Sequence, residues 1–213
     1  MKLSRPLKTY GWKILIDRCR NRSYTNIFVS NVFAVIAVVL AFYLSLAATS
    51  SAVETKDTAK IESAIAVLEQ KGFSREVFLL KHFATFRSSQ NWLNSLTVKE
   101  SVYATTNYPF GIITIYKDFY TKAQDDTERA MILLHEVQHL QGGNEAEAYE
   151  YVWKNRRRLG WTLLSHGSTP TYITVDILTR ENAPELFICP AKMFGDCTEN
   201  LQLTRKLAKI TKF

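Results

Sequence analysis

The hydrophobic pattern is dominated by an uncharged apolar run from Ile27 to Ala48. Its few polar side chains lie near the two ends, and a helix built from it would have no polar face. About twenty residues, at a rise of about 1.5 Å each, match the thickness of the hydrocarbon core of a bilayer. The pattern therefore predicts a transmembrane helix over residues 27–48.

The chain after this run alternates between helical and strand periodicities. Helices are predicted over residues 58–71, from Ser74 onward, from Asp125–Asp126 to Leu140 or Gln141, from Asn144 to Arg158 or Leu159, and over 201–210. Strands are predicted over 102–106 and 112–116, and residues 172–178 fit either structure. We therefore expect an α+β domain over residues 53–213, with helices packed on a small mixed sheet.

The net charge of +7 is concentrated in the N-terminal segment. Residues 1–52 contain seven basic residues and one acid, whereas residues 53–213 contain 20 basic and 19 acidic residues. A nucleic-acid-binding domain would carry a basic face of its own. The run Arg156–Arg158 is more typical of a solvated helix face. The charge distribution therefore predicts no nucleic-acid partner.

The same distribution predicts the orientation in the membrane. Basic residues precede the apolar run and few follow it, so residues 1–26 are expected to form a cytoplasmic tail. Residues 53–213 would then lie outside the cytoplasm. A cleaved signal peptide is the alternative, because residues 45–47 and 50–52 offer small side chains at cleavage spacing. The long leader and the long apolar run favour an uncleaved anchor.

Two of the three cysteines, Cys189 and Cys197, fall in the predicted extracytoplasmic part. Pro190 and Gly195 between them favour a turn that brings the thiols together. In an oxidising compartment, a local disulfide is more common than two free thiols. We therefore expect a Cys189–Cys197 disulfide.

The sequence HEVQH at residues 135–139 lies inside one of the predicted helices. His135 and His139 are one turn apart on one face, so both imidazoles can reach a single cation. Glu136 on the adjacent edge can reach a metal-bound water without being a ligand. Two imidazoles and such a carboxylate suit a zinc ion, Zn²⁺, and a general base that takes a proton from water.

A catalytic zinc site needs a third protein ligand. Glu145 lies six residues after His139, and Gly142 between them allows the chain to leave the helix and reverse. Glu147 is the alternative, because a different turn would present it instead. Glu145 is the expected ligand.

The segment HEVQHLQGGNEAEAY resembles the zincin metallopeptidases. It is similar to the metzincin pattern HExxHxxGxxH with Glu in the last position, and to the gluzincin pattern in which a second helix supplies a Glu ligand. Both comparisons select Glu145. The resemblance implies a strand above the helix that pairs with an extended peptide substrate, for which residues 112–116 are the candidate. It also implies an oxyanion-stabilising side chain, with candidates Tyr149, Tyr151 and His166.

These observations predict a membrane-anchored zinc metallopeptidase acting on peptides or proteins. His135, His139 and Glu145 would bind the metal, and Glu136 would act as general base and then acid. Two alternatives stay open at this point. One is a non-catalytic anchored module for binding or envelope assembly that retains the fold, and the other is a zinc amidase acting on cell-wall peptides.

Overall fold

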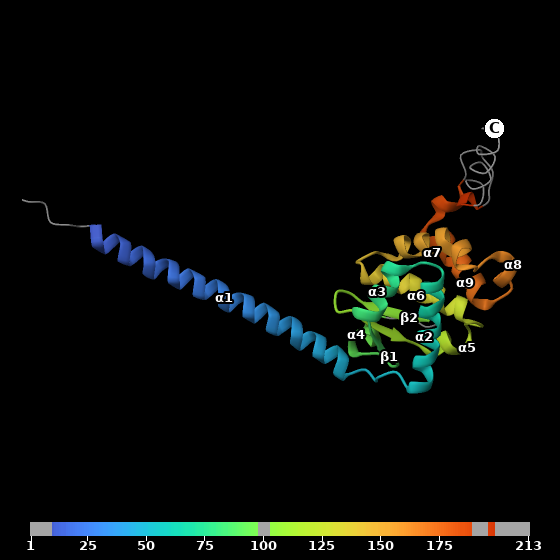
Figure 1. Ribbon diagram of the computed structural model, residues 1–213, viewed down its shortest axis with the longest axis horizontal. Coiled ribbons are helices and arrows are strands. Elements are labelled where there is room, and N and C mark those ends of the chain that lie inside the picture. Colours follow the sequence, from blue (N-terminus) through green and yellow to red (C-terminus); the bar gives the residue numbers. More distant parts are fainter. Residues whose placement is uncertain (1–9, 98–102, 189–195, 199–213) are drawn as a thin grey trace, which may run out of the picture. The chain divides into compact units, whose positions relative to one another are not determined.

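The structure is a computed structural model that describes residues 10–97, 103–188 and 196–198. The chain divides into two compact units, Met1–Leu46 and Ala47–Phe213. The second unit is mostly helical with a small mixed sheet, as Figure 1 shows, in agreement with the predicted α+β class. The predicted disulfide, which involves Cys189, and the predicted helix over 201–210 lie outside the described residues.

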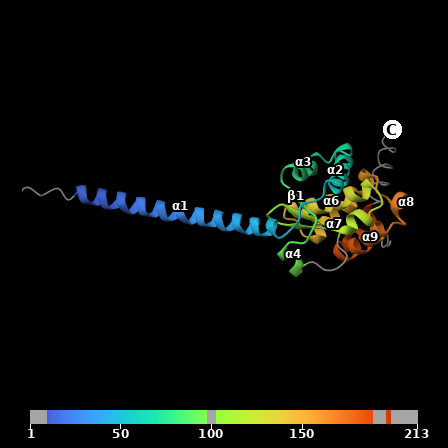
Figure 2. The same cartoon turned by 90° about the horizontal axis from the view of Figure 1, so that it is seen from below.

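Helix α1 (Tyr10–Ala48) is continuous, as Figure 2 shows. Its segment Asn26–Ala48, 23 residues with a mean hydropathy of 2.5, is long and apolar enough to cross a membrane. Most of the large side chains of this segment are exposed, for example Phe28 and Phe33. Exposed apolar side chains on all faces are expected of a helix whose solvent is lipid. A signal sequence near the N-terminus can also be apolar enough to meet this criterion, so retention of the segment stays a prediction.

The second unit contains eight α-helices, three strands and one short 3-10 helix among the described residues. They are α2 (Thr55–Gln70), α3 (Ser74–His82), β1 (Thr85–Arg87), α4 (Trp92–Thr97), β2 (Ala104–Asn107), β3 (Ile112–Ile115), α5 (Lys117–Thr121), α6 (Asp126–Leu140), α7 (Glu145–Leu159), α8 (Leu163–His166), α9 (Pro170–Asn182) and η1 (Pro184–Phe187). The ambiguous residues 172–178 belong to α9, which the Thr169 side chain caps and Pro170 begins.

Strand β3 lies in the centre of the sheet, whose strand order is β1-β3-β2. It pairs with β1 in parallel and with β2 antiparallel. All four residues of β3 are buried, as expected of a continuous apolar run that is covered on both faces. The expectation that residues 112–116 offer a free edge to a peptide is therefore wrong. Strand β2 is an edge strand of this sheet.

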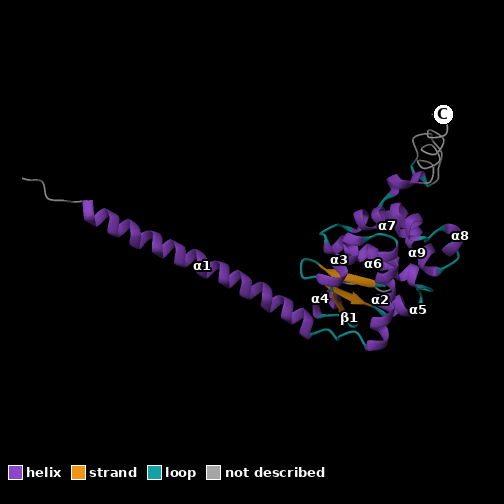
Figure 3. Cartoon of the chain, viewed as in Figure 1, coloured by secondary structure: helices purple, strands orange, loops and turns teal. Residues whose placement is uncertain are grey.

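One face of the sheet packs on the helices. Ile113 and Ile115 of β3 join the main hydrophobic core together with apolar residues of α2 and α6. Figure 3 shows this arrangement of helices and strands. Helix α6 packs against α2, α7 and β2, so most of its residues are buried. This central position brings α6 beside both the edge strand and the following helix.

The opposite face of the sheet carries a buried polar network. The Asn91 side-chain amide donates to Asn107 Oδ1 at 2.7 Å, and the Asn107 amide donates to Asn94 Oδ1 at 2.7 Å. The Asn94 amide in turn donates to Thr114 Oγ1 at 3.0 Å. All four side chains are at least nine-tenths buried. Buried amides are stable only when hydrogen-bonded, so this network fixes the start of α4 against β2 and β3.

The expectation of a solvated basic face on α7 is wrong for Arg156, which is 2% exposed. Its guanidinium pairs with Asp196 and packs over the Trp153 ring. Arg158 donates to the carbonyl oxygens of Lys71 and Gly72 just after α2, at 2.9 and 2.6 Å. A cation near the end of a helix is favourable there. Both arginines therefore contact other parts of the second unit, Arg156 as a buried side chain and Arg158 as an exposed one.

Replacing Asn94 by Ala should destabilise the second unit. The change removes partners of Asn107 and Thr114 and leaves buried polar atoms without hydrogen bonds, so we expect a loss of about 2–3 kcal/mol. Thermal unfolding of the full chain in detergent micelles measures this. The control Asn182→Ala, at the half-buried end of α9, should stay within about 0.5 kcal/mol of wild type. Equal stability of the Asn94 variant and wild type would contradict the role of the network.

Candidate metal centre

Helix α6 carries the HEVQH segment in its last two turns. It begins with the Asp125 side chain, which accepts the Glu128 amide at 2.9 Å. After α6 the chain reverses at Gly142, whose φ of +84° is a left-handed conformation that favours glycine. The Gly143 amide then donates to the Gln138 carbonyl at 2.9 Å. This reversal turns the following residues back toward His139.

Helix α7 begins with a reciprocal capping arrangement. Asn144 Oδ1 accepts the Glu147 amide at 3.0 Å, and Glu147 Oε2 accepts the Asn144 amide at 2.9 Å. Each interaction satisfies an amide that the start of a helix leaves without a backbone partner. The Glu147 carboxylate is thereby held at the cap. Glu145, the first residue of α7, is left to face the two histidines.

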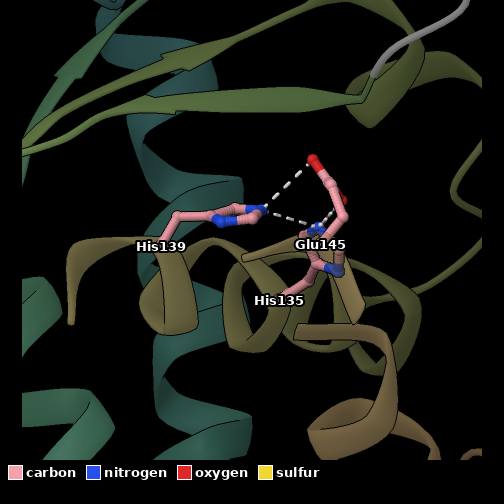
Figure 4. Close-up of side chains that lie close together, drawn as sticks. All are labelled: His135, His139 and Glu145. Atoms are coloured by element: carbon pink, nitrogen blue, oxygen red, sulfur yellow. Dashed lines mark hydrogen bonds and ion pairs between the residues drawn. The ribbon is translucent and has the colours of Figure 1, made fainter. Parts of the chain in front are cut away.

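The three predicted ligands His135, His139 and Glu145 lie together, as Figure 4 shows. The two Nε2 atoms of the histidines are 3.1 Å apart. Glu145 Oε2 is 3.3 Å from His135 Nε2, and Glu145 Oε1 is 3.5 Å from His139 Nε2. In a tetrahedral zinc site with bonds of about 2.0–2.1 Å, neighbouring ligand atoms are about 3.3 Å apart. The spacing of these donor atoms therefore fits zinc.

A backbone carbonyl orients one of the histidines. His139 Nδ1 lies 2.9 Å from the Gly143 carbonyl oxygen. A proton on Nδ1 donates to this carbonyl, which leaves Nε2 as the nitrogen that faces His135 and Glu145. Metal-binding histidines commonly have such a partner on the second ring nitrogen, and it fixes both tautomer and ring direction.

The three candidate ligands also form a charge cluster. Hydrogen bonds from His135 and His139 hold the pKa of Glu145 well below its ordinary value. Burial acts to lower the pKa of His139, but hydrogen bonds to Glu145 and to the Gly143 carbonyl outweigh it and raise that pKa to about 9. His139 is therefore protonated at neutral pH, and a metal ion must displace this proton to bind.

Glu136 lies beside this cluster and is 4% exposed. Burial raises the pKa of its carboxyl group, although the neighbouring histidines oppose the shift. Its Oε2 accepts a hydrogen bond from the Thr106 hydroxyl on β2 at 2.7 Å. A carboxylate with a raised pKa that borders a metal site is suited to accept and return a proton.

A pocket of about 210 Å³ opens over the cluster. Helix α6, helix α7, strand β2 and Val175 of α9 contribute its lining, and Figure 4 shows strands of the sheet above the three side chains. The lining includes Glu136 as well as the three candidate ligands. The pocket thus exposes the Glu136 carboxylate and the three candidate metal ligands to the same solvent space, beside the edge strand.

Only one of the three oxyanion candidates lies at the pocket. The Tyr149 ring packs edge-on against His135, with the ring centroids 4.5 Å apart, and it lines the pocket. The Tyr151 hydroxyl instead donates to Glu76 at 2.6 Å. His166 bonds Asp125 and Ser165 near the start of α6. The structure therefore retains Tyr149 alone as a candidate.

The contact between Thr106 and Glu136 was not expected from the sequence. The two residues are thirty positions apart, and a threonine in a strand gives no local indication of a partner on a helix.

Comparisons with protein-family models, curated proteins and solved structures found no match.

The purified chain should bind about one zinc ion, and Glu145→Ala should lose it. Loss of a residue that only hydrogen-bonds to a metal ligand lowers metal affinity by roughly 10–100-fold. Removing a ligand itself should lower zinc affinity by more than this. Glu147→Ala is the matched control, because its carboxylate is held at the helix cap. Elemental analysis and competition with a chelator measure both. Retention of zinc by Glu145→Ala and its loss from Glu147→Ala would reverse the assignment.

Zinc binding at pH 7 should release about one proton from His139. Because the imidazole must be neutral to bind metal, affinity should rise by roughly tenfold per pH unit from pH 7 and level off near pH 9. Calorimetry in buffers of different ionisation enthalpy counts the proton. His82→Ala, which changes a histidine away from the site on α3, should show the same release. A zinc affinity that is constant between pH 7 and 9 would contradict the prediction.

Proposed function

We propose that this chain is a membrane-anchored zinc metallopeptidase whose second unit, Ala47–Phe213, hydrolyses peptide bonds. The observation that carries the proposal is the shared pocket. Three metal-binding side chains of suitable spacing and a buried carboxylate, Glu136, line one cavity. A structural zinc site is closed by four protein ligands and needs no base, whereas a hydrolytic site needs both an open position and a base.

His135 Nε2, His139 Nε2 and one Glu145 oxygen would hold the zinc ion. When bound, zinc supplies Lewis-acid chemistry, because it polarises a carbonyl group and lowers the pKa of water toward neutrality. Among the described residues, the group contains these three ligands and no fourth. This number leaves a coordination position for water or substrate.

Glu136 performs the proton transfers in this proposal. Its carboxylate takes a proton from the attacking water and later gives it to the leaving amine. Burial favours the protonated form, so the group can hold the proton between these two steps. The Thr106 hydroxyl donates to Oε2 of this carboxylate. Tyr149 is the candidate to stabilise the developing oxyanion.

An extended peptide is the substrate that this site would accommodate. Strand β2 pairs with β3 along one side, and no described strand pairs with its other side. Residues Ala104, Thr105 and Thr106 of β2 line the pocket. An edge strand offers backbone amide and carbonyl groups that an added peptide strand can pair with. Such pairing would place the peptide beside the pocket that the three candidate ligands line.

The anchor gives the proposed enzyme its location. Helix α1 contains one apolar segment of membrane-spanning length. The seven basic residues that precede Ile27 favour a cytoplasmic N-terminus, so the catalytic unit would face the extracytoplasmic side.

The decisive variant is Glu136→Gln, which removes the base and keeps nearly the same shape. It should slow cleavage of a pool of fluorescence-quenched peptides by about 10²–10⁴-fold, while zinc content stays at the wild-type value. Glu150→Gln is the matched control, because that carboxylate pairs with Lys154 outside the pocket. It should cleave at the wild-type rate.

Two results would contradict the proposal. A Glu136→Gln variant that cleaves as fast as wild type would remove the assigned base. A wild-type chain that binds zinc but cleaves no peptide in the pool would favour the non-catalytic module or the amidase.

A further inference from the structure

Strand β2 contacts the proposed base directly through Thr106. The Thr106 hydroxyl lies 2.7 Å from Glu136 Oε2 and 3.3 Å from the Glu136 backbone carbonyl oxygen. The shorter distance is typical of a hydroxyl that donates to a carboxylate. Among the described residues, no other side chain is hydrogen-bonded to this carboxylate. Thr106 is therefore the hydrogen-bond donor that sets its direction.

A buried glutamate needs such a partner to have a defined orientation. The terminal torsion of Glu is broad, so rotamer preference alone leaves the plane of the carboxylate free to turn. Glu136 is 4% exposed, and water has little access to orient it instead. A base that transfers a proton must present one oxygen at a fixed position.

The register of the sheet determines where Thr106 points. Side chains alternate between the two faces of a strand, so Thr106 shares a face with Ala104. Thr106 pairs with Ile113 of β3, and both Ala104 and Ile113 belong to the hydrophobic core that α6 covers. Asn107 points to the other face and is held by the asparagine network. A slip of one residue would turn Thr106 away from Glu136. The network thus supports the contact from the opposite face.

The strand itself does not require a hydroxyl at this position. Valine has the same branched shape and a similar preference for strands. We propose that Thr106 is a positioning residue, whose hydroxyl holds Glu136 Oε2 so that Oε1 is aimed at the reacting water. The inference rests on the proposed function and adds the edge strand to its catalytic arrangement.

The test compares Thr106→Val with Thr106→Ser in the full zinc-loaded chain in detergent micelles. Thr106→Val should lower kcat on a pool of fluorescence-quenched peptides by about tenfold to a hundredfold, with KM and zinc content unchanged. Thr106→Ser keeps the hydroxyl and should recover most of the rate. Thr121→Val makes the same change at an exposed position on α5 and should match wild type.

A second measurement does not depend on turnover. In the zinc-free full chain, the loss of thermal stability from Thr106→Val should be smaller when Glu136 is already Ala, because the hydrogen bond is then absent. Additive shifts in Tm would overturn the contact. An unchanged kcat in Thr106→Val, or a loss of zinc from it, would overturn the positioning role.

These readouts separate the two hypotheses. If the Tm shifts are coupled but wild type cleaves no peptide, the proposed function is rejected. The positioning role of Thr106 is then rejected as well, although its contact with Glu136 is supported. Cleavage by wild type together with full activity of Thr106→Val would reject the positioning role alone.

Discussion

The site depends on the reversal of the chain between α6 and α7. Gly142 supplies the left-handed turn, and the Gly143 carbonyl accepts the hydrogen bond that orients His139. The next residue, Asn144, caps α7, and Glu145 then lies opposite the two histidines. A side chain at position 142 would be strained in this conformation. A few residues thus end one helix, orient one candidate ligand and present another.

The edge strand β2 is the second support of the site. It is only four residues long, and short strands are weakly specified by their backbone pairing alone. Polar contacts on both faces compensate for this. Asn107 joins the buried asparagine network on one face, and Thr106 reaches Glu136 on the other. Each of these groups is buried or partly buried, so losing a partner would be costly and the register is well determined.

Much of the fold was predictable where the periodicity extends over several turns. The long helices α2, α6 and α7 were expected close to their observed bounds, and β2 and β3 were expected as strands. The short elements β1, α4, α5 and α8 were not expected, because they are too short to establish a period and, unlike β3, contain no run of β-branched residues. The order of the strands was also unpredictable, since the pairing of β3 with two partners is decided by contacts distant in the chain. Arg156 was expected to be solvated for a similar reason, because its partner Asp196 lies forty residues away in the chain.

The sequence by itself determined the candidate ligands. Helical spacing places His135 and His139 on one face, and the glycines after them permit the turn that brings Glu145 back. It left Glu147 as an alternative, since the sequence does not show which of two carboxylates near the start of a helix forms the cap. In the tertiary structure Glu145 faces the two histidines, whereas Glu147 closes the capping arrangement with Asn144. The tertiary structure also decided which strand borders the pocket and which side chain holds Glu136. These relations join residues far apart in the chain, and only the packing of α6 against the sheet brings them within hydrogen-bond distance.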